Sequence, residues 1–180
     1  MRSKWLLGLV SLCLGLFAAI PADADGVGVL ASPGYLKIKG QKSGDIAGGS
    51  TQKGHEGAIS VQSAEFQILA PTDLGSGLAS GKRQHKPLTI LKEVDKASPL
   101  LLQALVTNEN LTLFNLQLVA PGQDSVVYRI DLSNARVVDV HMITVDGRSR
   151  EQVSFAYQKI TWTWVSPNVV AMDDWNATGQ

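Results

Sequence analysis

The stretch that decides the fold is VVYRIDLSNARVVDVHMITVDGRSREQVSFAYQKITWTWV, residues 126–165. Apolar and polar residues alternate at its start, over residues 126–132, which predicts a half-buried strand. The turn-forming pairs Ser133-Asn134 and Asp146-Gly147 separate this strand from two more, the last of which runs from Val153 to Val165. We therefore predict an antiparallel meander of three strands in the C-terminal half.

Three of the predicted strands change the phase of their alternation partway along. The slips fall between residues 157 and 160, between residues 61 and 64, and between residues 142 and 143. One extra residue in a strand, a β-bulge, restores the pattern and bends the strand. Bent strands let a sheet close on itself. The sequence therefore predicts a mainly β fold: a bent antiparallel β-barrel of two packed sheets with one short α-helix.

The short helix is predicted to begin at Ser98-Pro99, because serine caps a helix and proline suits its first position. It should end near Asn108, since asparagine tolerates the left-handed backbone found past helix ends. Its apolar face is predicted to comprise Leu101, Leu102, Leu105 and Val106.

Two segments are predicted to be loops. Residues 41–57, QKSGDIAGGSTQKGHEG, contain a single large aliphatic residue, Ile46. A polar segment of this length inside a compact domain is either functional or a mobile connection. Residues 75–81 are rich in glycine and serine and are predicted to be flexible.

The N-terminus has the three parts of a secretory signal peptide, predicted over residues 1–24. Basic Arg2 and Lys4 precede an apolar run from Trp5 to Ile20, and Ala22-Asp23-Ala24 supplies small residues for the peptidase. We predict cleavage between Ala24 and Asp25. No later apolar run approaches membrane-spanning length, so stable membrane insertion is not expected.

Residues 25–180 then form the predicted barrel domain, with a core of about 35–165. The single cysteine, Cys13, lies in the predicted signal, so the domain is expected to lack both a disulfide and a thiol nucleophile. Lipid-modified signals need a small residue immediately before the cysteine. Because Leu12 precedes Cys13, a lipid anchor is not expected. The chain has 16 basic and 16 acidic residues. This balance speaks against nucleic-acid binding and permits self-association.

Candidate catalytic residues are sparse. His55, His85 and His141 do not stand at metal-ligand spacing, and we interpret His55 as a solvated loop residue and the other two as strand-end or strand-surface residues. No G-x-S-x-G or P-loop motif occurs. We therefore predict that the protein is not an enzyme and binds no metal or cofactor.

The C-terminal segment contains two further candidates. The adjacent acids Asp173-Asp174 are expected to be solvated in a polar tail. Trp162, Trp164 and Trp175 are the residue type of a sugar-stacking platform. Because Trp162 and Trp164 alternate within one strand, we interpret these two as core or interface packing.

Four segments resemble the Hcp family, the haemolysin-coregulated tube proteins of type VI secretion systems, and the likeness runs from about Tyr35 to Val165. They are YLKIKG at 35–40, HKPLTI at 85–90, DKASPLLLQA at 95–104 and VSFAYQKITWTW at 153–164.

The resemblance implies a β-barrel with one short helix and no enzymatic activity. It further implies that six copies close into a ring, and that rings stack into a hollow tube beneath a tip (spike) protein and inside a contractile sheath, for effector delivery. By position, the loop 41–57 would be the ring-stacking arm, with Lys53, His55 and Glu56 as polar contacts.

The predicted signal conflicts with this resemblance, because tube subunits assemble in the cytoplasm and leave by contraction of the sheath. Two functions therefore stay open. One is a ring-forming structural subunit; the other is a Sec-exported, monomeric periplasmic β-barrel that binds a small ligand or a polymer. The expected location is secreted or periplasmic, or cytoplasmic before contraction-driven export if the signal is not used.

Overall fold

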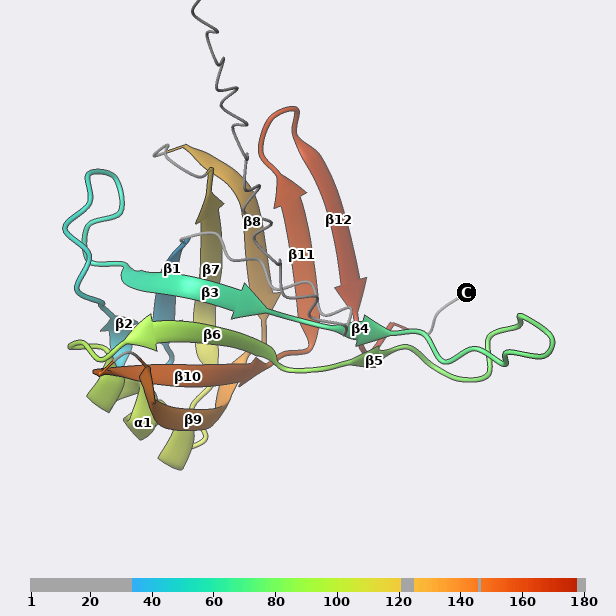
Figure 1. Ribbon diagram of the computed structural model, residues 1–180, viewed down its shortest axis with the longest axis horizontal. Helices are drawn as coiled ribbons and strands as arrows, with labels where there is room; N and C mark the ends of the chain where they lie inside the picture. Colours follow the sequence, from blue (N-terminus) through green and yellow to red (C-terminus); the bar gives the residue numbers. More distant parts are fainter. Residues whose placement is uncertain (1–33, 121–124, 146, 178–180) are drawn as a thin grey trace, which may run out of the picture.

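The computed structural model describes residues 34–120, 125–145 and 147–177. The predicted signal peptide, its cleavage site at Ala24 and Asp25, and Asp146 of the predicted turn lie outside these residues. The described chain forms twelve strands and one helix (Figure 1). The strands are β1 Gly34–Gly40, β2 Gly44–Ile46, β3 Ile59–Glu65, β4 Ile68–Leu69, β5 Gln84–His85, β6 Leu88–Glu93, β7 Leu111–Val119, β8 Val126–Ser133, β9 Arg136–Val145, β10 Arg148–Ala156, β11 Lys159–Trp164 and β12 Val169–Asp174; the helix is α1 Ser98–Val106.

Ten of the strands form one antiparallel sheet in the order β12-β11-β8-β7-β1-β3-β6-β10-β9, with β2 paired to β1 off this path. In Figure 1, β7, β8, β11 and β12 run steeply across β3, β6, β10 and β9, so that two layers enclose the core. Phe114 and Phe155 meet in this core edge to face, with ring centroids 4.9 Å apart. No helix within the described ranges has the length and hydrophobicity needed to span a bilayer.

The barrel closes through two long strands that bend together. β8 pairs with β11 and β9 pairs with β10, so residues 126–145 and 148–164 form one long hairpin with a corner in the middle. At the corner Asn134 has a left-handed backbone, φ 49°, and its side-chain amide donates to Gln158 Oε1 at 2.7 Å. Ser133-Asn134 therefore bends the chain instead of reversing it. The predicted fold class is confirmed, but the three-strand meander is wrong at this point.

The predicted phase slips mark real irregularities, although one lies elsewhere. The register between β3 and β6 shifts between Val61 and Ser63, as predicted. In β9 the extra residue is Val138, whereas the sequence placed the slip after Met142. Both Val138 and Met142 are exposed. The slip near residue 158 is the corner itself, and it divides the predicted strand 153–165 into β10 and β11.

Strand β12 was missed by the sequence analysis, which expected a polar tail. It pairs with β11 along its whole length, from Lys159 opposite Asp174 to Trp164 opposite Val169. Its apolar residues Val169, Val170 and Met172 are exposed. Because they do not alternate between a buried and an exposed face, the pattern gave no strand signal.

The helix α1 lies where it was predicted, with Asn108 left-handed at φ 49° beyond its end. Ala97 occupies the N-cap position, so Ser98 is the first helical residue and not the cap. The buried helical residues are Ser98, Leu101 and Ala104, while Leu102 and Val106 are exposed. The predicted apolar face therefore wrongly included Leu102 and Val106, which face solvent.

The helix is joined to the barrel by a buried ion pair. Lys92 of β6 is fully buried, and its Nζ lies 2.9 Å from Glu151 Oε2 of β10 and 3.0 Å from Ser98 Oγ of α1. The carbonyl of Glu93 at 2.7 Å and Asp95 Oδ1 at 2.9 Å complete the surroundings of this ammonium. A buried charge is tolerated only when such partners replace its lost hydration.

Lys92→Met should lower the free energy of unfolding by about 3–5 kcal/mol, because it leaves the Glu151 carboxylate buried without its cation. The double variant Lys92→Met/Glu151→Leu removes both charges and should recover most of this loss. Urea unfolding of the three proteins measures both effects. A single variant as stable as the wild type would contradict the assignment.

Candidate functional site

A hairpin arm, residues 67–86, leaves the barrel between β3 and β6. β4 pairs with β5 at its base, and an isolated bridge joins Thr72 to Ala79 further out. Figure 1 shows the arm extending far beyond the barrel. At its tip Asp73 Oδ1 accepts hydrogen bonds from the backbone amide and the hydroxyl of Ser76, both at 2.7 Å. The segment 75–81, predicted as a loop, is thus the end of an ordered hairpin.

The base of the arm is fastened to β12 by Asp173. The Arg83 guanidinium donates two hydrogen bonds to the Asp173 carboxylate and a third to the carbonyl of Asp174. His85 Nε2 lies 2.7 Å from Asp173 Oδ2, and His85 Nδ1 lies 3.2 Å from the Tyr157 hydroxyl. We call Arg83, His85 and Asp173 the arm latch.

The arm latch changes the protonation of its members. Hydrogen bonding from Arg83 holds the pKa of Asp173 below its ordinary value of 3.8, against the effect of burial, and His85 lowers it further. Burial raises the pKa of Tyr157 to about 12, with a contribution from the Asp173 charge. Asp173 is therefore an ionised structural partner and not the solvated acid that the sequence suggested.

Trp175 extends the contact between the arm and the C-terminal segment. Lys82 Nζ lies 4.9 Å from the centre of its ring and donates to its carbonyl at 2.5 Å. The His85 ring meets Trp175 edge to face at 5.6 Å. Trp162 packs against the core, as predicted, whereas Trp164 is 47% exposed.

The predicted loop 41–57 is largely ordered. Glu109 holds its start: Oε1 accepts from the amides of Lys42 at 2.5 Å and Ser43 at 2.7 Å, and Oε2 accepts from the Ser43 hydroxyl at 2.6 Å. The Ser43 hydrogen bonds lower the pKa of Glu109. Gly40 is required here, because a Cβ at this position would lie 2.5 Å from Glu109 Oε1.

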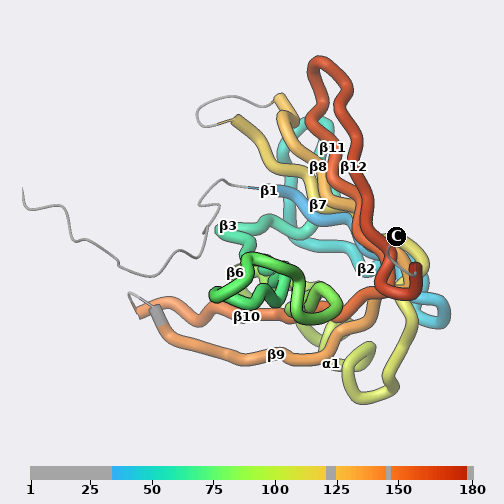
Figure 2. The backbone as a smooth tube through the Cα atoms, turned by 90° about the vertical axis from the view of Figure 1, so that its right-hand side faces the viewer, coloured from blue at the N-terminus to red at the C-terminus, as the bar shows by residue number. Residues whose placement is uncertain are grey.

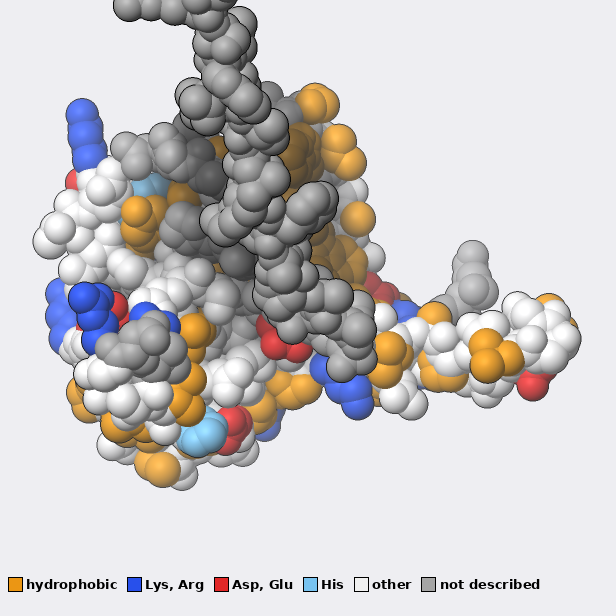
Figure 3. Space-filling model, in the orientation of Figure 1, with side chains coloured by type: hydrophobic (Ala, Val, Ile, Leu, Met, Phe, Trp, Pro, Cys, Tyr) orange, Lys and Arg blue, Asp and Glu red, His pale blue; other side chains and the backbone are white. Residues whose placement is uncertain are grey.

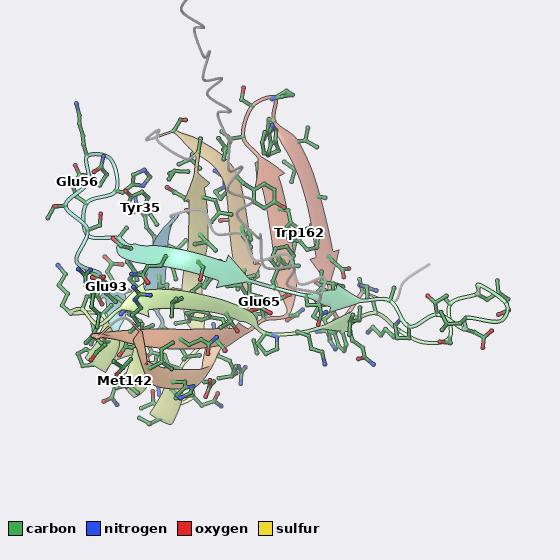
Figure 4. The ribbon with its side chains drawn as sticks, viewed as in Figure 1. Tyr35, Glu56, Glu65, Glu93, Met142 and Trp162 are labelled. Atoms are coloured by element: carbon green, nitrogen blue, oxygen red, sulfur yellow. The ribbon has the colours of Figure 1, made fainter. Side chains whose placement is uncertain are left out.

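The three predicted stacking residues lie in the outer part of this loop but differ in exposure. Lys53 and Glu56 are exposed, whereas His55 is 6% exposed and stacks on Tyr35 of β1, with ring centroids 4.0 Å apart. Figure 4 labels Tyr35 and Glu56 on this side of the molecule. The interpretation of His55 as a solvated residue is wrong, because its ring fixes the loop against β1.

The three histidines do not converge. His55 stacks on Tyr35, His85 belongs to the arm latch and His141 is exposed on β9. The described ranges contain no group of three or more His, Cys, Asp or Glu side chains that could hold a metal ion. The polar clusters around Lys92, Asp173 and Glu109 each join one structural element to another.

A groove of about 440 Å³ lies where the arm joins β6 and β10. Thr89 and Ser154 face each other in it, with their hydroxyl oxygens 2.9 Å apart. Its remaining lining is mixed: Glu65, Phe66, Gln67, Lys86, Pro87 and Gln152. Figure 4 labels Glu65 at this junction.

The bent barrel and its fastened arm define a mainly β protein whose charged clusters hold its elements together. The family model "Type VI secretion system effector, Hcp" matches residues 35–164, and the chain belongs to the Hcp family. The resemblance noted in the sequence is therefore confirmed. Hcp proteins are structural tube components of type VI secretion systems.

Individual relatives match the chain over most of its length. The "Major exported protein" of Pseudomonas aeruginosa is 36% identical over 168 residues, which cover 82% of this chain and 98% of that protein. A mutant of Hcp1 from the E. coli EAEC 042 pathovar is 34% identical, with a TM-score of 0.72, and covers 81% of this chain and 99% of that one. The secreted protein Hcp3 of Pseudomonas aeruginosa is 34% identical, with a TM-score of 0.67, over 79% and 99% of the two chains.

Asp173→Asn should loosen the arm, because it removes the charge that binds Arg83 and His85. For a partly exposed ion pair we expect a loss of about 1–2 kcal/mol, equivalent to a roughly five- to thirtyfold gain in local opening. Trypsin cleavage after Lys82 and Arg83 measures this opening. Asp139→Asn is the control, since Asp139 is exposed on β9 and the change in charge is the same.

The effect of Asp173→Asn has a defined pH dependence. The pKa of Asp173 is depressed in the folded protein. The stability that its negative charge contributes is therefore fully present above the ordinary pKa of 3.8 and is lost as the pH falls through the folded pKa. The melting temperatures of the wild type and of Asp173→Asn should therefore differ at neutral pH and converge only below about pH 3.8. Equal melting and cleavage at neutral pH would contradict the arm latch.

Proposed function

We propose that this protein is the structural subunit of a type VI secretion tube, in which six copies close into a ring and rings stack into a hollow channel for effector delivery. The observation that carries the proposal is the match to Hcp structures over nearly their whole length. The competing function, a monomeric ligand-binding barrel, has less support, because it would leave this likeness unexplained.

A ring subunit needs shape and packing surfaces more than reactive groups. A head-to-tail interface closes into a ring by rotation and must bury a large, well-packed area on each copy. The formal net charge of zero limits repulsion between copies. Lys92 is paired with Glu151, and Arg83 is paired with Asp173, in contacts that hold the fold together. These features favour a structural role without catalysis.

Contacts between stacked rings are part of the proposal. Lys53 and Glu56 are exposed in the loop 41–57 and are the proposed polar contacts, while the buried His55 stacks on Tyr35. The arm also reaches well beyond the barrel (Figure 1) and offers Leu74 and Leu78 at its tip. Tip protein, sheath and effector cargo are the further proposed partners.

Export is proposed by two routes that leave different N-termini. The relative in Pseudomonas aeruginosa is named for its export. If residues 1–24 act as a signal peptide, the mature chain begins at Asp25 and is periplasmic or secreted. If they do not, the chain leaves the cytoplasm when the sheath contracts.

Purified protein comprising residues 25–180 should form rings at high concentration. Light scattering coupled to size exclusion gives the mass, and negative-stain imaging shows the ring. A monomer at every concentration would contradict the tube function. A change in tryptophan fluorescence on adding a ligand, with no change in mass, would instead support the ligand-binding barrel.

The N-terminal residue of the protein recovered from fractionated cells separates the two export routes. We expect Asp25 in the periplasmic or culture fraction, because the three-part signal is complete. An intact N-terminus in the cytoplasm would contradict cleavage and would favour loading into a cytoplasmic sheath. An Ala24→Leu variant, which blocks the peptidase site, is the matched control.

A further inference from the structure

We propose that a cavity at the corner of the barrel binds one ring of a saccharide. The cavity has a volume of about 270 Å³ and lies where β9 begins, where β10 passes into β11 and where the chain leaves β12. Figure 2 shows the end of β12 beside the bend between β10 and β11. We call this site the corner cavity. Its polar and aromatic lining residues are Asn134, Arg136, Tyr157, Gln158, Trp175 and Asn176.

Trp175 supplies the aromatic surface of the corner cavity. Trp162 packs against the core, whereas Trp175 is 37% exposed and lines the cavity. The C–H groups on one face of a pyranose ring are apolar, and they pack against a large, flat indole while the hydroxyl groups point to polar neighbours. An exposed indole in a polar cavity is therefore suited to stacking against a sugar.

The orientation of Trp175 is fixed before a ligand binds. Its backbone amide donates to the Gln158 carbonyl at 2.8 Å, which attaches it to the corner. Lys82 Nζ lies 4.9 Å from the ring centre, and the His85 ring meets the indole edge to face. Figure 3 shows basic and acidic side chains together where the arm leaves the barrel. A surface that is ordered in advance loses less conformational entropy on binding.

Three carboxamides line the cavity together with the indole, those of Asn134, Gln158 and Asn176. A carboxamide both donates and accepts hydrogen bonds, as a sugar hydroxyl does. The Asn134 amide donates to Gln158 Oε1 at 2.7 Å, which fixes two of the three groups. Among the described residues, neither Asn134 Oδ1 nor the Asn176 side chain has a hydrogen-bond partner. These groups are available to the hydroxyls of a ligand.

Arg136 adds further donors at the rim of the cavity. Its side chain is exposed, and one terminal nitrogen donates to Asn108 Oδ1 at 3.2 Å. Within the ranges that the structure describes, this is the one hydrogen bond of the guanidinium. Since a guanidinium carries five N–H donors, most of them remain available to ring or hydroxyl oxygens.

The lining favours a neutral, hydroxyl-rich ligand over an ion. Asp174 lies at the margin of the cavity, where its Oδ1 accepts from the Asn176 amide at 2.9 Å and from Gln158 Nε2 at 3.4 Å. This negative charge disfavours a phosphate or carboxylate ligand, and the Arg136 charge disfavours a cation. A purely apolar ligand is disfavoured as well, because it would strip water from the carboxamides without replacing their hydrogen bonds.

The size of the cavity fits a single ring of a longer chain. Pockets for drug-sized ligands usually have about 300–1,000 Å³, and the corner cavity, at about 270 Å³, is smaller. Asn134, Arg136 and Asn176 are exposed, so the cavity is open on their side. A glycan can therefore place one ring in the cavity and continue outside it.

Titration of the purified protein with two saccharides tests the inference. The probes are chitotetraose, made of N-acetylglucosamine, and maltotetraose, made of glucose. We expect saturable binding of at least one of them, with a Kd on the order of 1 mM, because only one ring makes contact. Saturation-transfer NMR on the saccharide and tryptophan fluorescence both measure it. Tighter binding of chitotetraose would indicate a glycan of N-acetylated amino sugars, and tighter binding of maltotetraose would indicate a glucan.

Two variants and a control locate the site. Trp175→Leu removes the stacking surface and should abolish saturable binding. Arg136→Ala/Asn176→Ala leaves the indole in place and should weaken binding about tenfold, because two hydrogen-bonding side chains are lost. The control, Trp164→Leu, removes an indole that is 47% exposed on β11 outside the cavity, and it should retain the wild-type Kd. NMR on the saccharide follows binding whichever indole is removed.

The contact of Trp175 with the arm requires a check on folding. Trypsin cleavage after Lys82 and Arg83 shows whether the arm of Trp175→Leu stays closed. If this variant is cleaved faster than the wild type, the double variant at Arg136 and Asn176 decides, because neither side chain contacts the arm latch among the described residues.

The outcomes separate this inference from the tube function. Wild-type rings that bind neither saccharide overturn the site and leave the ring standing. Rings that bind a saccharide support both. A monomer that binds one supports the site and the competing ligand-binding barrel, and it contradicts the tube function. Binding that is unchanged in the double variant overturns the corner cavity as the site.

Discussion

The structure depends on the corner at which two long strands bend side by side. Residues 126–145 and 148–164 stay paired through the bend, so one hairpin belongs to both layers of the barrel. The left-handed Asn134 and its hydrogen bond to Gln158 satisfy polar groups where regular pairing is interrupted. Without this corner the two layers would be joined along the sheet only where β1 pairs with β3.

Local patterns in the sequence identified the parts of the fold but not how they connect. Alternation and its slips predicted bent strands, and Ser98-Pro99 placed the helix. The turn pair Ser133-Asn134 has the same composition whether the chain reverses or bends, and only the pairing of β8 with β11 distinguishes the two. Strand β12 escaped detection because its two faces are similarly exposed, and a period of two carries no signal there.

The candidate site shows the same limit. Polarity and length identified the loop 41–57, and its exposed Lys53 and Glu56 fit that expectation. Nothing local to His55 indicates that it stacks on Tyr35, twenty residues earlier. The arm latch was equally hidden, since Arg83 and Asp173 are separated by 90 residues and become neighbours only when β12 joins the sheet. Contacts between distant residues need the tertiary fold, which a single sequence does not display.

Through the arm latch, strand β12 fixes the arm, which lies far from it in the sequence. Arg83 lies at the base of the arm, but its anchor, Asp173, is translated 90 residues later. A premature stop before Val169 would therefore remove an edge strand and also release a hairpin encoded far upstream. During synthesis the arm stays unfastened until Asp173 has been made, so a shorter nascent chain cannot present a fully oriented arm to another subunit.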